Sequence, residues 1–127
     1  YAGVDIEESI QGESLRKLVK GDASEWRDAL YYTFYEFPGE HRVKRHYGVR
    51  TDRYKLIHFY YDIDEWELYD LEEDPSEMHN VYNDPAYTAV RKEMHDQLKV
   101  MRSKYGDSDA MDQENLNRFL KAKGLSK

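Results

Sequence analysis

The chain has 127 residues, of which 26 are acidic, 19 are Lys or Arg and none is Cys. This length fits one domain, and the lack of Cys excludes disulfides, thiolate metal sites and cysteine nucleophiles. Aromatic residues make up 14% of the sequence, more than a disordered acidic chain would carry, so we predict a folded domain. Because the sequence starts with Tyr1 rather than Met, we expect it to be a piece of a larger protein.

Charge is distributed unevenly, and the net charge of −7 hides two opposite segments. Residues 41–55 contain six basic residues and one acidic residue, whereas residues 62–84 contain ten acidic residues and no Lys or Arg. A basic segment beside an acidic one can bind an external anion or pair with its neighbour. The charge pattern leaves both alternatives open.

The first predicted elements are a short helix and a strand. Gln11 to Ser14 precede a helical stretch at residues 15–19 that Gly21 can end. Residues 29–37 alternate with aromatic side chains on both sides of the chain, which favours a strand covered on both faces. Pro38-Gly39 then ends this pattern.

Three more strands are predicted, at residues 46–51, 54–60 and 66–71. Short turns at 52–53 and 62–64 connect them. Successive strands joined by such short connections form an antiparallel meander.

A long helix is predicted over residues 85–105. Asp84-Pro85 is a favourable helix start, and Gly106 suits a left-handed cap at the other end. Between them, apolar residues recur every three or four positions in one stripe: Tyr87, Val90, Met94, Leu98, Met101 and Tyr105. A sheet offers a face for such a stripe, so we predict an α+β fold, a four-stranded antiparallel sheet packed against a long C-terminal helix.

Common catalytic and metal motifs are missing from the sequence. It has no G-x-S-x-G elbow, no Gly-rich phosphate loop and no H-E-x-x-H zinc helix. Asp62, Asp64 and Glu73 fit the first, third and last positions of a calcium loop, but Glu67 occupies the position that requires Gly. We therefore interpret the acidic segment as turns.

The basic segment offers a better candidate site. Residues 38–46 form a predicted loop that enters a strand, and they contain Arg and His donors suited to an anion. Pairing of these residues with the acidic segment is the alternative.

Several motifs in chain order resemble one known family. They are Trp26 to Tyr32, Tyr47-Gly48-Val49-Arg50-Thr51, Arg53 to Ile57, Glu67 to Leu71, Asp74-Pro75-Ser76-Glu77 and Asn80-Val81, with Gly3-Val4 and Ser14-Leu15 before them. Over about residues 1–106 the sequence is similar to the C-terminal subdomain of bacterial sulfatases, the formylglycine-dependent type in the alkaline-phosphatase-like superfamily.

This resemblance implies a domain layout. Residues 1–28 would be a linker with a short helix, 29–71 the sheet and 85–105 its helix, docked beside an N-terminal α/β catalytic domain of the same protein. Residues 107–127 would be a polar tail with one short helix around Leu116, Phe119 and Leu120.

The resemblance also implies hydrolysis of sulfate esters by a formylglycine, made within a C/S-x-P-x-R motif, with a calcium ion bound by Asp and Asn. No C/S-x-P exists here, because Glu36, Glu73 and Asn83 stand two residues before the three prolines. We therefore expect the nucleophile and calcium ligands upstream of Tyr1 and no catalytic or metal residue in this chain, which alone should hydrolyse nothing.

For substrate binding we predict that His41, Arg45 and His46 face a sulfated carbohydrate, with help from Lys44 or Arg42. One alternative is a stand-alone module that binds an acidic glycan or nucleic acid, and another is a purely structural lid. The negative net charge and the lack of a recognised nucleic-acid-binding motif argue against the binding of nucleic acid.

The cellular location of the protein is expected from the family resemblance alone. Exported enzymes are usual among such sulfatases, so we expect a periplasmic or extracellular protein. The sequence shows no signal peptide and no apolar run of the roughly 18 residues that a membrane helix needs.

Overall fold

The computed structural model describes residue 7 and residues 9–125, which form a sheet with helices beside it. Four antiparallel strands pair in chain order: β1 (Ala29–Phe34), β2 (His46–Thr51), β3 (Tyr54–Phe59) and β4 (Glu65–Asp70). The predicted meander is therefore confirmed. Residues 1–6 and 8 of the predicted linker lie outside the described residues.

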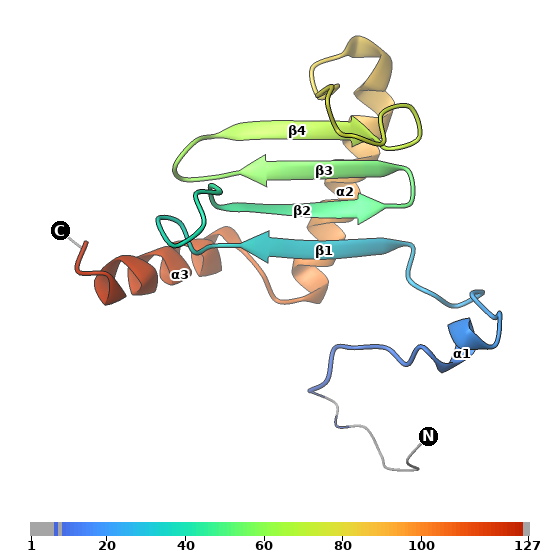
Figure 1. Cartoon of the computed structure of the whole chain (residues 1–127), viewed down its shortest axis with the longest axis horizontal. Coiled ribbons are helices and arrows are strands. Elements are labelled where there is room, and N and C mark those ends of the chain that lie inside the picture. The colour runs from blue at the N-terminus through green and yellow to red at the C-terminus, as the bar shows by residue number, and fades with distance from the viewer. Residues whose placement is uncertain (1–6, 8, 126–127) are drawn as a thin grey trace.

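The helices lie mostly after the sheet in the sequence. They are α1 (Arg16–Val19), the 3-10 turn η1 (Pro85–Tyr87), α2 (Thr88–Lys104) and α3 (Asp109–Ala122). In Figure 1, α2 crosses behind the strands, and α3 continues beyond the sheet toward the C-terminus. This arrangement confirms the predicted α+β class. No helix in the described part of the chain has the length and apolar character to cross a membrane.

The long helix begins and ends as its sequence predicts, except for the first turn. The Asp84 carboxylate accepts a hydrogen bond from the Ala86 amide, and Pro85 occupies the first position. That turn is 3-10, so α2 proper starts at Thr88. At the other end Gly106 has φ +68°, the left-handed geometry of a helix cap.

The core lies between α2 and one face of the sheet. In register across the strands, Tyr31, Val49, Leu56 and Leu68 form one row. Val49, Leu56 and Leu68 are fully buried, and Met94 and Leu98 of α2 pack on them. Burial of each such side chain stabilises the fold by about 2 kcal/mol.

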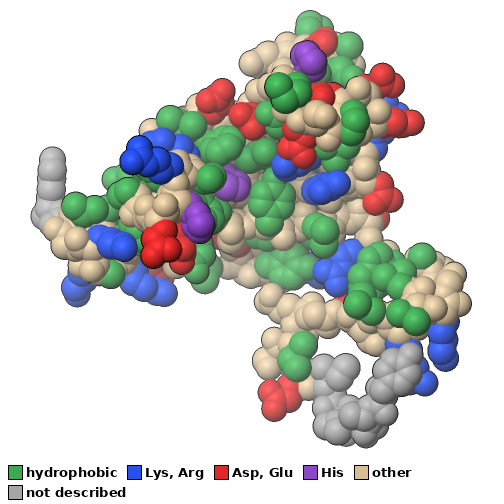
Figure 2. Space-filling view, viewed as in Figure 1, with side chains coloured by type: hydrophobic (Ala, Val, Ile, Leu, Met, Phe, Trp, Pro, Cys, Tyr) green, Lys and Arg blue, Asp and Glu red, His purple; other side chains and the backbone are tan. Residues whose placement is uncertain are grey.

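The opposite face of the sheet is open. It presents the alternate residues of each strand, among them Leu30, Tyr32 and Phe34 of β1, His46 of β2 and Phe59 of β3, together with the charged residues Arg50, Lys55, Glu65 and Glu67. Leu30 is half exposed. Figure 2, drawn from this side, shows hydrophobic side chains over the strands with basic and His side chains among them. Among the described residues no helix crosses this face (Figure 1). The prediction that both faces of β1 are covered is thus wrong within this chain, because α2 supplies only one cover.

Apart from the first turn of the long helix, two elements differ from their predictions by more than one residue at an end. β1 ends at Phe34 rather than at residue 37, because the chain leaves the sheet for the following loop. The C-terminal tail contains a 14-residue helix rather than a short one. Ser108 caps α3 by accepting from the Met111 amide, and Leu116 within this helix is buried. The proposed division of the chain at residue 106 stays a prediction.

Candidate functional site

The β1–β2 loop, residues 35–45, contains the predicted basic site. Its first turn is tight, because a Cβ on Gly39 would lie 2.4 Å from the Glu36 carbonyl oxygen. The Lys44 ammonium lies 3.9 Å from the centre of the Phe37 ring, so the stem of the loop is closed by its own side chains. His41 and Arg42 are exposed on the loop.

His46 begins β2 on the open face, where neighbouring rings fix its orientation. Its ring centre lies 5.7 Å from that of Phe34 and 5.2 Å from that of Phe59, its partners on the adjacent strands. Nδ1 lies 2.8 Å from the Lys44 carbonyl oxygen, which can only accept. Nδ1 therefore carries a proton, and in the neutral ring Nε2 keeps a lone pair for a substrate donor.

A glycine shapes the surface of the sheet beside His46. A Cβ on Gly48 would lie 2.6 Å from the Tyr32 hydroxyl and 2.5 Å from the Leu56 carbonyl oxygen. Gly48 thus lets the Tyr32 ring lie flat across β2. The Tyr32 hydroxyl is buried, and desolvation raises its pKa. The result is a flat aromatic surface around one imidazole.

Arg45 lies on the other side of the sheet, since successive side chains of an extended chain point in opposite directions. It is 1% exposed, and its Nη1 is 2.9 Å from a carboxylate oxygen of Asp62. Asp62 belongs to the acidic segment, so this pair matches the alternative that the sequence left open. The structure therefore brings His46 and the His41 loop to one edge but does not bring Arg45 to the same face. Binding of the substrate by His41, Arg45 and His46 stays a prediction.

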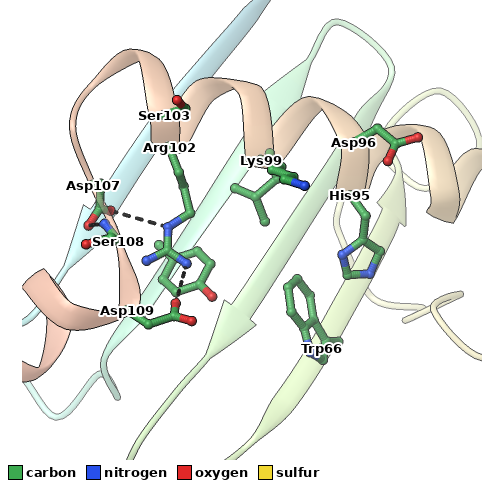
Figure 3. A pocket seen from close by; sticks show the side chains of 11 residues that line it. Trp66, His95, Asp96, Lys99, Arg102, Ser103, Asp107, Ser108 and Asp109 are labelled. Carbon is green, nitrogen blue, oxygen red and sulfur yellow. Dashed lines mark hydrogen bonds and ion pairs between the residues drawn. The ribbon is translucent and has the colours of Figure 1, made fainter.

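A cavity lies on the α2 side, away from these residues (Figure 3). It has a volume of about 580 Å³, and Trp66 and His95 lie at one end and Arg102 at the other. Desolvation by burial, followed by the nearby Arg91 charge, lowers the pKa of His95. None of the predicted binding residues lines this cavity.

The Arg102 end of this cavity is occupied by protein carboxylates. The Arg102 guanidinium is 2.8 Å from Asp109, 2.7 Å from Asp112 and 3.7 Å from Asp107, and it covers the Tyr47 ring at 4.0 Å. Burial, reinforced by Asp107, raises the pKa of Asp112 to about 6, although Arg102 opposes the shift. Through Nη1 and Nη2, Arg102 joins α3 to α2, whereas its Nε makes no hydrogen bond within the described residues. The cavity lies beside this junction, between α2 and the sheet residues Tyr47 and Trp66.

His58 lies against Trp66, which lines this cavity. Their rings stack at 4.0 Å, and His58 is held between the Tyr47 hydroxyl at 2.8 Å and Asp64 at 2.9 Å. Burial raises the pKa of Tyr47 to about 12, so its hydroxyl stays neutral. Within residues 7 and 9–125, no group of three or more His, Asp or Glu side chains is arranged to hold a metal ion.

Sequence reasoning missed Asp62 and Phe119 as neighbours of the basic loop. The sequence places Asp62 in a turn of the acidic segment and Phe119 in the short helix of the polar tail. Both meet Arg45 only because the β3–β4 turn and α3 come together in space. No spacing in the sequence carries that information.

The sequence of residues 1–104 matches the protein family described as N-sulphoglucosamine sulphohydrolase, C-terminal. The chain belongs to this family. The resemblance to a sulfatase C-terminal subdomain is thereby confirmed.

Three relatives illustrate the similarity. An N-acetylglucosamine-6-O-sulfatase of Bacteroides thetaiotaomicron is 44% identical over 119 residues, which are 91% of this chain and 21% of that protein. A Δ4,5-hexuronate-2-O-sulfatase of the same species is 33% identical over 92 residues, 72% of this chain and 17% of that protein. A protein solved in complex with its substrate, D-glucosamine-2-N,6-O-disulfate, has a TM-score of 0.80 and 46% identity, covering 84% of this chain and 22% of that one. The chain thus spans about a fifth of the length of these relatives.

Proposed function

We propose that this chain is the C-terminal part of a sulfatase that hydrolyses sulfate esters of glucosamine-type glycans. The observation that carries the proposal is the family match over residues 1–104. Similarity to an N-acetylglucosamine-6-O-sulfatase and to a protein solved with a sulfated glucosamine supports the substrate class. We also propose a periplasmic or extracellular location, in keeping with the family.

The catalytic machinery would belong to the remaining part of the protein. The family resemblance implies a formylglycine nucleophile and a calcium ion, and the residues described here do not fit either group. Calcium and formylglycine are thus proposed for an N-terminal catalytic domain of the same protein. This chain by itself should release no sulfate.

The open face of the sheet is the proposed contact with that domain. Its aromatic surface, formed by Tyr32, Phe34 and Phe59 with His46 in the last row next to the loop, is covered by no helix of the described chain. An apolar surface of this kind marks an interaction site when it faces a partner. The loop of residues 35–45 would then stand at the margin of the interface, beside the substrate.

His46 and His41 would contact the sugar that bears the sulfate. His46 supports this role best, because its ring is held by Phe34 and Phe59 while Nε2 remains an acceptor for a sugar hydroxyl. Loops on a rigid sheet are frequent positions for such contacts. Arg42 and Lys44 would add positive charge near the anionic substrate.

The test uses the intact protein and measures sulfate release from N-acetylglucosamine 6-O-sulfate and from an aryl sulfate that has no sugar. His46→Phe keeps a ring between Phe34 and Phe59 but removes Nε2. We expect it to raise KM for the sugar sulfate at least threefold and to leave the aryl sulfate unaffected. His41→Ala should act in the same direction.

His79→Ala is the matched control, because this His is 82% exposed and lies in a different loop. It should change neither substrate's kinetics. An intact protein that releases sulfate from neither substrate would refute the sulfatase proposal. Normal kinetics for both His46→Phe and His41→Ala would instead leave the loop with a purely structural role.

A further inference from the structure

Arg45 closes the base of the β1–β2 loop. Its Nε donates to the Tyr35 carbonyl at 3.1 Å, which ties the last residue of the loop to the first. Its own carbonyl accepts from the Tyr60 amide at 3.1 Å, which ties the loop to the end of β3. The position of the loop therefore depends on where this one residue is held.

A buried ion pair orients the Arg45 guanidinium. Nη1 donates to Asp62 at 2.9 Å, and the two side chains are 1% and 13% exposed. Separation of this pair would leave an uncompensated buried charge, which is costly. The two groups therefore stay together in one orientation. Asp62 thus determines which way the fork of Arg45 points.

Two aromatic rings complete the surroundings of the guanidinium. Its carbon lies 5.5 Å from the centre of the Tyr61 ring and 5.4 Å from that of Phe119 in α3, both within the range of cation–π attraction. Tyr61 adopts φ 67°, a left-handed conformation unusual for a residue other than glycine. Nη2 of Arg45 is buried and makes no hydrogen bond within the described residues.

Phe119 connects this assembly to a helix that the family model does not include. The match ends at residue 104, whereas α3 covers Asp109–Ala122. α3 is itself held on the domain by Leu116, which is 2% exposed, and by the pair between Asp112 and Arg102. Direct contacts therefore connect α3 to the loop: Phe119 of the helix contacts Arg45, and Arg45 holds the loop.

We propose that Asp62 and Phe119 are positioning residues for substrate binding. By holding Arg45 they fix the loop of residues 35–45 and the adjoining His46, so that α3 contributes to the affinity for the sugar. This inference rests on the proposed sulfatase function. Its physical basis is that a contacting group displaced by about 1 Å loses much of its contribution to binding and orientation.

The experiment uses the intact protein with Asp62→Asn and Phe119→Leu. Asp62→Asn removes the charge that orients Arg45, and Phe119→Leu removes the ring but keeps an apolar side chain. We expect each to raise KM for N-acetylglucosamine 6-O-sulfate about fivefold, with kcat within twofold and the aryl sulfate kinetics unchanged. Asp64→Asn is the control, because Asp64 lies in the same turn but is 86% exposed and pairs with His58.

Hydrogen exchange supplies a readout independent of activity. Exchange of the Tyr60 amide, which donates to Arg45, should become about tenfold faster in both variants and stay unchanged in Asp64→Asn. The double variant should be no worse in KM than the stronger single variant, because both substitutions act through Arg45.

Failure can be assigned to one proposal or the other. If His46→Phe raises KM but Asp62→Asn and Phe119→Leu do not, the positioning role is overturned while the sulfatase function stands. If Tyr60 exchange is the same in all variants, the positioning role is overturned even in a protein without activity. Additive effects in the double variant would likewise contradict a shared route through Arg45.

Discussion

Two arginines, Arg102 and Arg45 with side chains 13% and 1% exposed, attach α3 to the rest of the domain, one near each end, and they do so by different means. Arg102 of α2 meets the first turns of α3 through the carboxylates of Asp109 and Asp112, with Asp107 nearby. Arg45 has one carboxylate partner, Asp62, and meets α3 through the ring of Phe119. The first attachment carries excess negative charge, whereas the second is balanced.

This difference has a consequence for solution conditions. Three carboxylates around one guanidinium repel one another, so that end of α3 should respond to pH. The Arg45 end depends on one ion pair and on aromatic rings, so it has no such crowding of carboxylates. The loop with His46 is thus connected to the less pH-sensitive attachment.

Arg102→Met tests the charged attachment most severely. The substitution keeps much of the side chain's bulk but leaves Asp107 and Asp112 without a cation in a largely buried setting. We expect the free energy of unfolding of the chain to fall by about 3 kcal/mol, as measured by urea unfolding. Arg118→Met, at an exposed position of α3, is the control and should have little effect. A loss below 1 kcal/mol for Arg102→Met would show that α3 does not depend on this cluster.

The pH dependence of stability tests the raised pKa of Asp112. This pKa is about 6 in the folded chain, against an ordinary value of 3.8, so between these values the folded state binds more protons than the unfolded state. Stability from this group is therefore largest below about pH 4 and declines as pH rises to about 6, by on the order of 2 kcal/mol. Urea midpoints measured from pH 4 to 7 would show the decline.

Asp112→Asn should flatten this part of the pH profile, because the titrating group is gone. A profile in Asp112→Asn as steep as that of the original chain would assign the pH response to another group. Asp62→Asn, in the balanced attachment, should leave the slope between pH 4 and 6 in place.

Asp109→Asn should have the smallest effect. Its carboxylate is 2.8 Å from Arg102 but 92% exposed, and exposed ion pairs contribute little because water and salt screen them. We expect an unchanged urea midpoint at 0.15 M salt. A clear destabilisation would mean that all three carboxylates share the attachment equally.

Much of the fold could be predicted because it depends on local signals. Alternation in residues 46–51 and the stripe from Val90 to Met101 specify a strand and a helix with one apolar side each, and a short turn leaves an antiparallel neighbour as the only partner. The 3-10 first turn at Pro85 and the length of α3 were not predicted. Both depend on how the chain packs rather than on its periodicity.

The candidate site was predictable only in part. The chemistry of residues 41–46 pointed to an anion-binding loop, and His46 does lie on the open face. Arg45 could not be separated from His46 by residue type, because the same guanidinium suits a sulfate or a buried Asp. In the structure its side chain is 1% exposed, and its partner Asp62 comes from the turn after β3.

By itself the sequence determined the order and type of the elements, the α+β class and the sulfatase family, because turn residues, periodicity and ordered motifs are local properties of the chain. Only the tertiary structure decided which basic residues remain available to a ligand and that α3 reaches the loop through Phe119. Those outcomes depend on contacts between residues 17 and 74 positions apart, Arg45 with Asp62 and with Phe119, and such contacts arise only when the sheet and α3 have come together.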